Sequence, residues 1–148
     1  MAIITKVRNW LATCPLLDQF ADGQHIDWTD ETAGNYGIAP TGCSDVDVKE
    51  DIIGNITKTK QYNVVLYARD WTIDDVARLE NTEFLDEFAD WVEEQVRTGA
   101  APIFGDDPDL ERITAQNGML YQMDPDGQTG LYQIQINITY IKKYTKGA

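Results

Sequence analysis

The segment LYQIQINITYIKKY, residues 131–144, restricts the possible folds of this chain more than any other feature. Its large apolar side chains recur at every second position, with polar residues between them. Alternate residues of a strand point to opposite faces of a sheet, so this pattern predicts a strand with one buried face and one wet face. Such a strand is typical of an antiparallel sheet covered on one side. The apolar positions are Tyr132, Ile134, Ile136, Ile138 and Tyr140.

Three other segments also have strand character. Residues 44–52 and 61–70 alternate in the same way, and Gly54 and Asn55 between them indicate a turn or a bulge. The stretch TKTKQ could extend the second of these strands as a solvated ribbon. A further strand, residues 112–122, forms a hairpin with the last strand through the turn DPDGQTG.

Two amphipathic helices are expected to cover this sheet. The first spans residues 2–14 and ends at Pro15, because the residue before a proline avoids the helical region. The second spans residues 82–98, is capped by Asn81 or Thr82, and ends at Gly99. A short helical turn capped by Thr72 precedes it. The order of elements predicts a single α+β domain over residues 1–148, with a mainly antiparallel sheet packed by two main helices on one face.

Residues 18–44 have no helical pattern and contain four glycines. A structureless loop of this length is uncommon in a compact domain, so part of it should be extended and paired. We expect a long extended arm, in which NYGIAPTG forms a short strand or an edge segment.

Charge and cysteine usage narrow the functional classes. Twenty-five Asp and Glu against 12 Lys and Arg give a net charge of −13, which repels phosphate and disfavours nucleic-acid binding. Cys14 and Cys43 are too few for a disulfide framework or a zinc site. No segment has the length and apolarity of a membrane span or a signal peptide. These features predict a protein made in a reducing cytoplasm.

Three acidic motifs are candidate sites of chemistry. His25 stands beside Asp27, Asp30 and Glu31 and could bind a divalent metal, but the chain has no second histidine and a solvated loop explains the motif better. Asp45 with Asp47 could form a carboxylate pair, but a polar strand face explains them better. DPDG lacks the late glutamate of a calcium loop and fits an ordinary turn. We therefore expect no catalytic residue, no metal and no cofactor.

Several segments taken together resemble a known family. They are WLATCPLL, IDWTDETAGNYGIAPTG, the acidic FLDEFADWVEEQ and the C-terminal LYQIQINITYIKK. In order and character they are similar to the small tail-assembly proteins of phages and prophages of Gram-positive bacteria, often labelled minor capsid proteins, and most of all to the tail terminators. The resemblance implies an α+β fold and a hexameric ring that stops growth of the tail tube and meets the neck. In contractile tails and headless, phage-tail-like bacteriocins the ring also meets the sheath.

Two expectations follow from this resemblance. A ring needs two different patches on each subunit, and the extended arm could supply one, through Ile26, Trp28, Tyr36 and Ile38. A lumen lined with carboxylates would let DNA slide through, and its candidates are Asp45, Asp47, Glu50, Asp106, Asp107 and Asp109. The partners would then be further copies of the chain, the tail tube protein and sheath or neck proteins, in a particle assembled in the bacterial cytoplasm. The alternatives are a head–tail connector or stopper, a small metal-dependent hydrolase using His25, and a monomeric ligand-binding domain.

Overall fold

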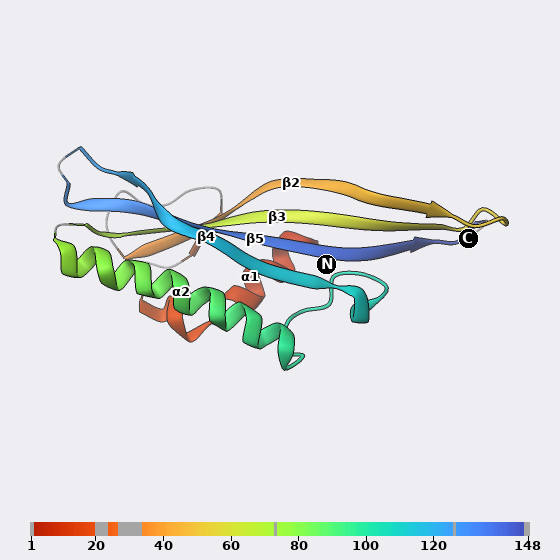
Figure 1. The fold of residues 1–148 in the computed structure, drawn as a ribbon, viewed down its shortest axis with the longest axis horizontal. Coiled ribbons are helices and arrows are strands. Elements are labelled where there is room, and N and C mark those ends of the chain that lie inside the picture. The colour runs from red at the N-terminus through yellow and green to blue at the C-terminus, as the bar shows by residue number, and fades with distance from the viewer. Residues whose placement is uncertain (1, 20–23, 27–33, 73, 126, 147–148) are drawn as a thin grey trace.

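The computed structural model describes residues 2–19, 24–26, 34–72, 74–125 and 127–146, and it has an α+β fold. A sheet of five strands lies against two α-helices (Figure 1). The strand order is β1-β2-β3-β5-β4, in which β1 pairs in parallel with β2 and all other neighbours are antiparallel. The expected fold class is therefore confirmed: the sheet is mainly antiparallel and two main helices pack on it.

The last strand, β5, is central to this sheet. It spans Thr129–Tyr144 and pairs with β3, Ile56–Trp71, over its whole length without a register shift. On its other side it pairs with β4, Arg112–Met123. The apolar face predicted for residues 131–144 is buried and the polar face is half-exposed, as the period-2 pattern indicated.

Strand β2 is longer than the sequence pattern predicted. It runs from Asn35 to Glu50 as one strand, through Gly37, Pro40 and Gly42, and pairs with β3 throughout. The register shifts between Pro40 and Gly42, so a bulge accommodates the proline and the glycine that looked like breakers. The second half of the expected arm at residues 18–44 is therefore part of the sheet.

The described beginning of that arm is also ordered. The 3-10 helix η1 spans Pro15–Gln19, and the short strand β1, Gln24–Ile26, pairs in register with residues 36–38 of β2. Residues 20–23 and 27–33 lie outside the described part of the chain.

Both helices lie on the same side of the sheet (Figure 1). Helix α1, Ile3–Leu11, buries Val7, Trp10 and Leu11. Helix α2, Asp75–Arg97, buries Phe84, Leu85, Phe88 and Val92. These side chains form one hydrophobic core with the covered face of the sheet, which contributes Ile38, Val64, Leu66, Ala68, Tyr132, Ile134, Ile136 and Ile138.

Helix α2 corrects the prediction of a short turn followed by a separate helix. The helix is continuous, and Asp74 rather than Asn81 or Thr82 caps it, accepting a hydrogen bond from the Ala77 N–H at 2.8 Å. Asn81 is committed elsewhere, because its side-chain amide donates to the Trp71 carbonyl. At the other end Gly99, with φ of +77°, is the predicted cap glycine.

Candidate functional site

Half of the long sheet projects beyond the helices as a three-stranded ribbon of β2, β3 and β5 (Figure 1). We call this ribbon the blade, defined as residues 44–61 and 139–146. Strand pairing continues to its end, where Glu50 pairs with Ile56 and Ile56 with Tyr144. At the tip, the side chains of Ile52 and Ile53 are exposed. The exposed side chains along β2 and the large apolar tip form a surface suited to contact another molecule.

One face of the blade carries a cluster of lysines. Lys60 lies opposite Tyr140, and Lys58 lies opposite Lys142. Opposed residues of antiparallel strands share a face, and Tyr140 belongs to the core, so these lysines continue the face that the helices cover nearer the centre. We refer to Lys58, Lys60 and Lys142 as the lysine cluster.

A single carboxylate serves two members of this cluster. Asp45 lies 2.7 Å from Lys60 Nζ and 3.3 Å from Lys58 Nζ. The hydrogen bond from Lys60 lowers the pKa of Asp45, and the contact with Lys58 adds to this shift. The Lys58 ammonium also lies 5.6 Å from the centre of the Tyr144 ring. Because two lysines share one acid and Lys142 lies beside them, the cluster keeps a positive charge.

The predicted acidic lumen is divided between two places in this structure. Asp45, Asp47 and Glu50 lie on β2 at one edge of the blade. Asp106 and Asp107 lie beside β5 at the other edge, where the Asp106 carboxylate accepts the Lys143 N–H at 2.8 Å and Asp107 lies 3.8 Å from Lys143 Nζ. Asp109 follows in the 3-10 helix η2, Pro108–Leu110. The six acids therefore do not form one continuous patch on the subunit, since β3 and β5 place lysines between them.

The predicted interface arm needs a correction at two of its four residues. Tyr36 and Ile38 are buried in the core of their own chain, at 5% and 0% exposure, so their side chains do not face a neighbour. The reason is that β2 starts at Asn35 and points both side chains at the helices. Ile26 pairs with Ile38 in the parallel ladder. Trp28 lies outside the described residues.

The histidine motif is only partly described. His25 lies in β1, where it pairs with Gly37, whereas Asp27, Asp30 and Glu31 are outside the described part of the chain. Among the residues that the structure does describe, no group of three or more His, Cys, Asp or Glu side chains is arranged to hold a metal ion.

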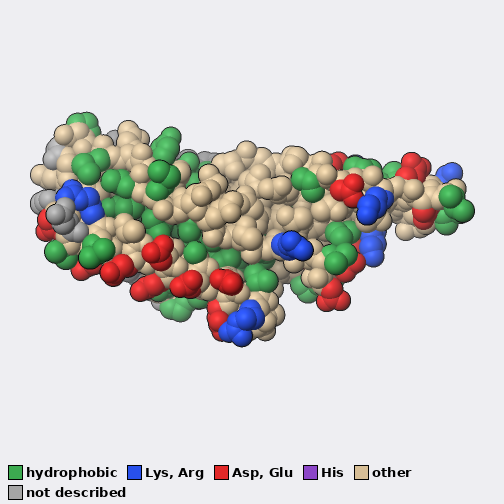
Figure 2. All heavy atoms as spheres, viewed as in Figure 1, with side chains coloured by type: hydrophobic (Ala, Val, Ile, Leu, Met, Phe, Trp, Pro, Cys, Tyr) green, Lys and Arg blue, Asp and Glu red, His purple; other side chains and the backbone are tan. Residues whose placement is uncertain are grey.

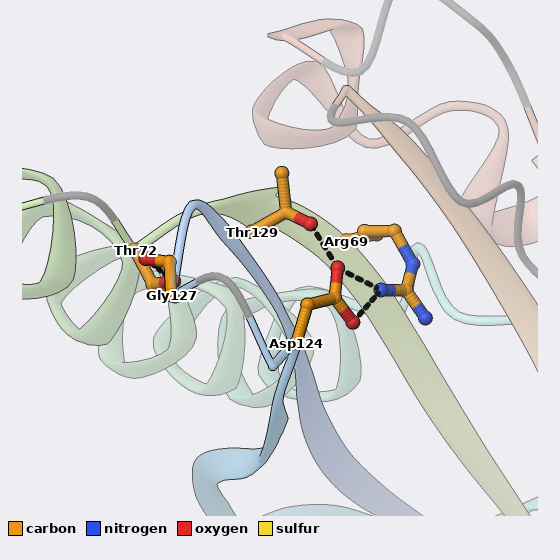
Figure 3. A network of polar contacts seen from close by, with 5 residues as sticks. All are labelled: Arg69, Thr72, Asp124, Gly127 and Thr129. Atoms are coloured by element: carbon orange, nitrogen blue, oxygen red, sulfur yellow. Dashed lines mark hydrogen bonds and ion pairs between the residues drawn. The ribbon is translucent and has the colours of Figure 1, made fainter.

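A polar network ties the DPDG turn to the end of β3 (Figure 3). Arg69 Nη1 lies 2.9 and 3.0 Å from the two carboxylate oxygens of Asp124, which also accepts the Thr129 hydroxyl. The bond from Thr129, followed by that from Arg69, lowers the pKa of Asp124. The buried Thr72 hydroxyl donates to the Gly127 carbonyl at 3.0 Å. This turn is a structural clamp between β3 and the β4–β5 hairpin, and Thr72 belongs to it rather than capping a helix.

The outer face of α2 carries a row of acidic side chains (Figure 2). They recur at spacings of three and four, so they form one ridge along the helix. Arg97 pairs with Glu94 at the end of this row. We call the row the acidic ridge; its members are the exposed Glu83, Asp86, Glu87, Asp90, Glu93 and Glu94.

Sequence reasoning identified these acids only as the polar side of a helix and did not identify the lysine cluster at all. The signal for the cluster was nevertheless present in the stretch TKTK, because lysines two apart on a strand share a face. The partner lysine on β5 could not be assigned before the register was known.

Comparison with known proteins adds no family assignment, because no protein-family model and no curated protein sequence matches the chain. Among the helices in the described part of the chain, none combines the length and apolarity needed to cross a bilayer.

Proposed function

We propose that this chain is a structural protein of a phage or phage-like tail, in which copies form a ring that caps the tail tube and stops its elongation. The observation that carries the proposal is the blade. Its strands are paired to the end, and its β2 side chains and its tip are exposed, so the subunit has an extended surface beyond its own core. Such a surface supports contact with a neighbouring copy or with the tube.

Two further observations support this proposal. The family resemblance of the sequence segments is to tail terminators, and the α+β fold agrees with the fold that this resemblance implies. The blade and the acidic ridge are also chemically different surfaces on one chain, as head-to-tail contacts in a ring require. The acids at both edges of the blade remain candidates for a lumen through which DNA passes.

The test is electron microscopy of particles produced without this protein. A terminator predicts tubes of uncontrolled length in the deletion strain, and normal tubes when the gene is restored. Tubes of normal length that lack only heads would refute termination and assign the chain to the head–tail connector instead. Normal particles in full number would refute both structural assignments.

A further inference from the structure

The acidic ridge of α2 places like charges beside one another along the helix, and Arg97 pairs with Glu94 at its end. Glu83 with Glu87, Asp86 with Asp90, and Asp90 with Glu94 are like-charged neighbours four residues apart. Each such pair destabilises an isolated helix. A cationic surface placed against the ridge would convert this repulsion into attraction.

The blade has the complementary properties. It carries six lysines and four acids, in a chain whose net charge is −13. Three of these lysines form the lysine cluster, on the side of the sheet where the helices lie. The helical layer of the same chain ends before this part of the sheet (Figure 1). A helix from another molecule would therefore extend the same layer over the part of the sheet that carries the lysine cluster.

We infer that the acidic ridge of one copy packs on the lysine cluster of the next copy. The occupant of the cluster is a second copy of this chain, because the same chain carries a ridge of opposite charge and suitable length. The acidic ridge, residues 83–94 of α2, is roughly 18 Å long, and the three residues of β3 from Lys58 to Lys60 span roughly 10 Å. The ridge is thus long enough to cover the whole cluster.

This contact is head-to-tail, since it joins two different patches. Repeating it builds a ring if the rotation closes and a filament if it does not. The inference deepens the proposed ring and rests on it for its biological setting, but the contact itself is tested on the purified chain.

Charge reversal on both sides provides the test. Lys58→Glu with Lys142→Glu reverses the cluster, and Glu87→Lys with Asp90→Lys reverses the ridge. Each double variant should weaken self-association by at least about tenfold in sedimentation velocity at about 0.15 M salt, because like charges then face each other. Mixing the two double variants should restore assembly of alternating copies, because every contact between unlike variants then joins opposite charges, and combining all four changes in one chain should also restore assembly.

A matched control uses the opposite face of the blade. Lys49 and Lys143 both align with Thr57 in the sheet register, so they lie on the face away from the lysine cluster. Lys49→Glu with Lys143→Glu changes the net charge by the same amount within the blade, on β2 and β5. This variant should assemble like the wild-type chain, and thermal unfolding checks that every variant is folded.

Three results would overturn the inference. The first is a control variant that loses assembly as strongly as the cluster variant. The second is a failure to assemble: either the variant with all four substitutions stays dissociated while it remains folded, or the wild-type chain is monomeric up to about 1 mM. The third is binding of duplex DNA by the wild-type chain that is lost only in the cluster variant. The lysine cluster would then be a binding site for phosphate groups. The charge swap can fail while the deletion strain still produces tubes of uncontrolled length. That combination would reject this contact and leave the proposed function unaffected.

Discussion

Replacing Trp10 by alanine tests how α1 is held on the rest of the molecule. Its ring lies 5.3 Å from the ring of Trp91 on α2, centre to centre, with an angle of 24° between the planes. Its indole N–H donates to the Gln95 side-chain carbonyl at 3.1 Å. Only 5% of Trp10 is exposed, so the substitution removes nearly the whole side chain from a packed environment.

The expected loss follows from these contacts. Truncation of a buried tryptophan to alanine costs about 3–5 kcal/mol, and the loss includes the cavity that remains. Stacking with Trp91 contributes about 0.5–1.5 kcal/mol of this, and the hydrogen bond to Gln95 about 0.5–1.5 kcal/mol. The free energy of unfolding of a domain of ordinary stability is about 5–15 kcal/mol, so Trp10→Ala should remove a large fraction of the stability of this chain.

Urea unfolding followed by far-ultraviolet circular dichroism measures the loss. Trp10→Phe is the matched control, because it keeps a ring against Trp91 and loses the N–H donor; its loss should be about 1–2 kcal/mol. A loss below about 1.5 kcal/mol for Trp10→Ala, or equal losses for both variants, would refute the role assigned to the stack and the cavity.

Three further perturbations have defined outcomes. A Cβ at Gly105 would lie 2.3 Å from the Ile141 carbonyl oxygen, so Gly105→Ala should destabilise the chain by about 1–3 kcal/mol in urea unfolding; an unchanged midpoint would contradict the tight approach of this loop to β5. The pKa of Asp124 is lowered in the folded state, so the ionised Asp124 carboxylate stabilises the fold. This stabilisation is present above the pKa of about 3.9 that Asp has in the unfolded chain, and it is lost as the pH falls through the folded-state pKa. Asp124→Asn should therefore flatten the acid limb of stability measured from about pH 7 to 2, and an unchanged slope would refute the clamp. Ile53→Ser at the exposed tip should leave stability within about 0.5 kcal/mol, and a larger loss would show that the tip is packed in its own chain.

The elements that could be predicted are the strands and helices that bury one face, because their apolar residues recur with the period of the element. Residues 132–140 alternate strictly, because this part of β5 is buried on one side. Helix α2 was recognisable from the stripe that includes Phe84, Phe88 and Val92. In both cases the residues that pack against the core are determined locally by the period of the element.

The parts that could not be predicted depend on partners far away in the sequence. Gly37, Pro40 and Gly42 have poor strand propensity, and they are extended because β3 pairs with them across a bulge. Asn81 resembled a helix cap, but its amide is used by the Trp71 carbonyl. The lysine cluster joins residues of β3 to Lys142 of β5, and only the sheet register brings them onto one face.

The central position of β5 has a consequence for how the chain folds during synthesis. It is the last strand in chain order, yet it lies between β3 and β4, and residues far apart in the sequence meet there, as Ile56 and Tyr144 do. Loop closure over such separations slows folding of antiparallel sheets. Until the ribosome has released β5, one edge of β3 is unpaired and Val64, Leu66 and Ala68 lack their partners on that strand. From the synthesis of β3 until that of β5, the nascent chain therefore exposes an apolar strand edge, and in this interval it is most open to aggregation or to chaperone binding.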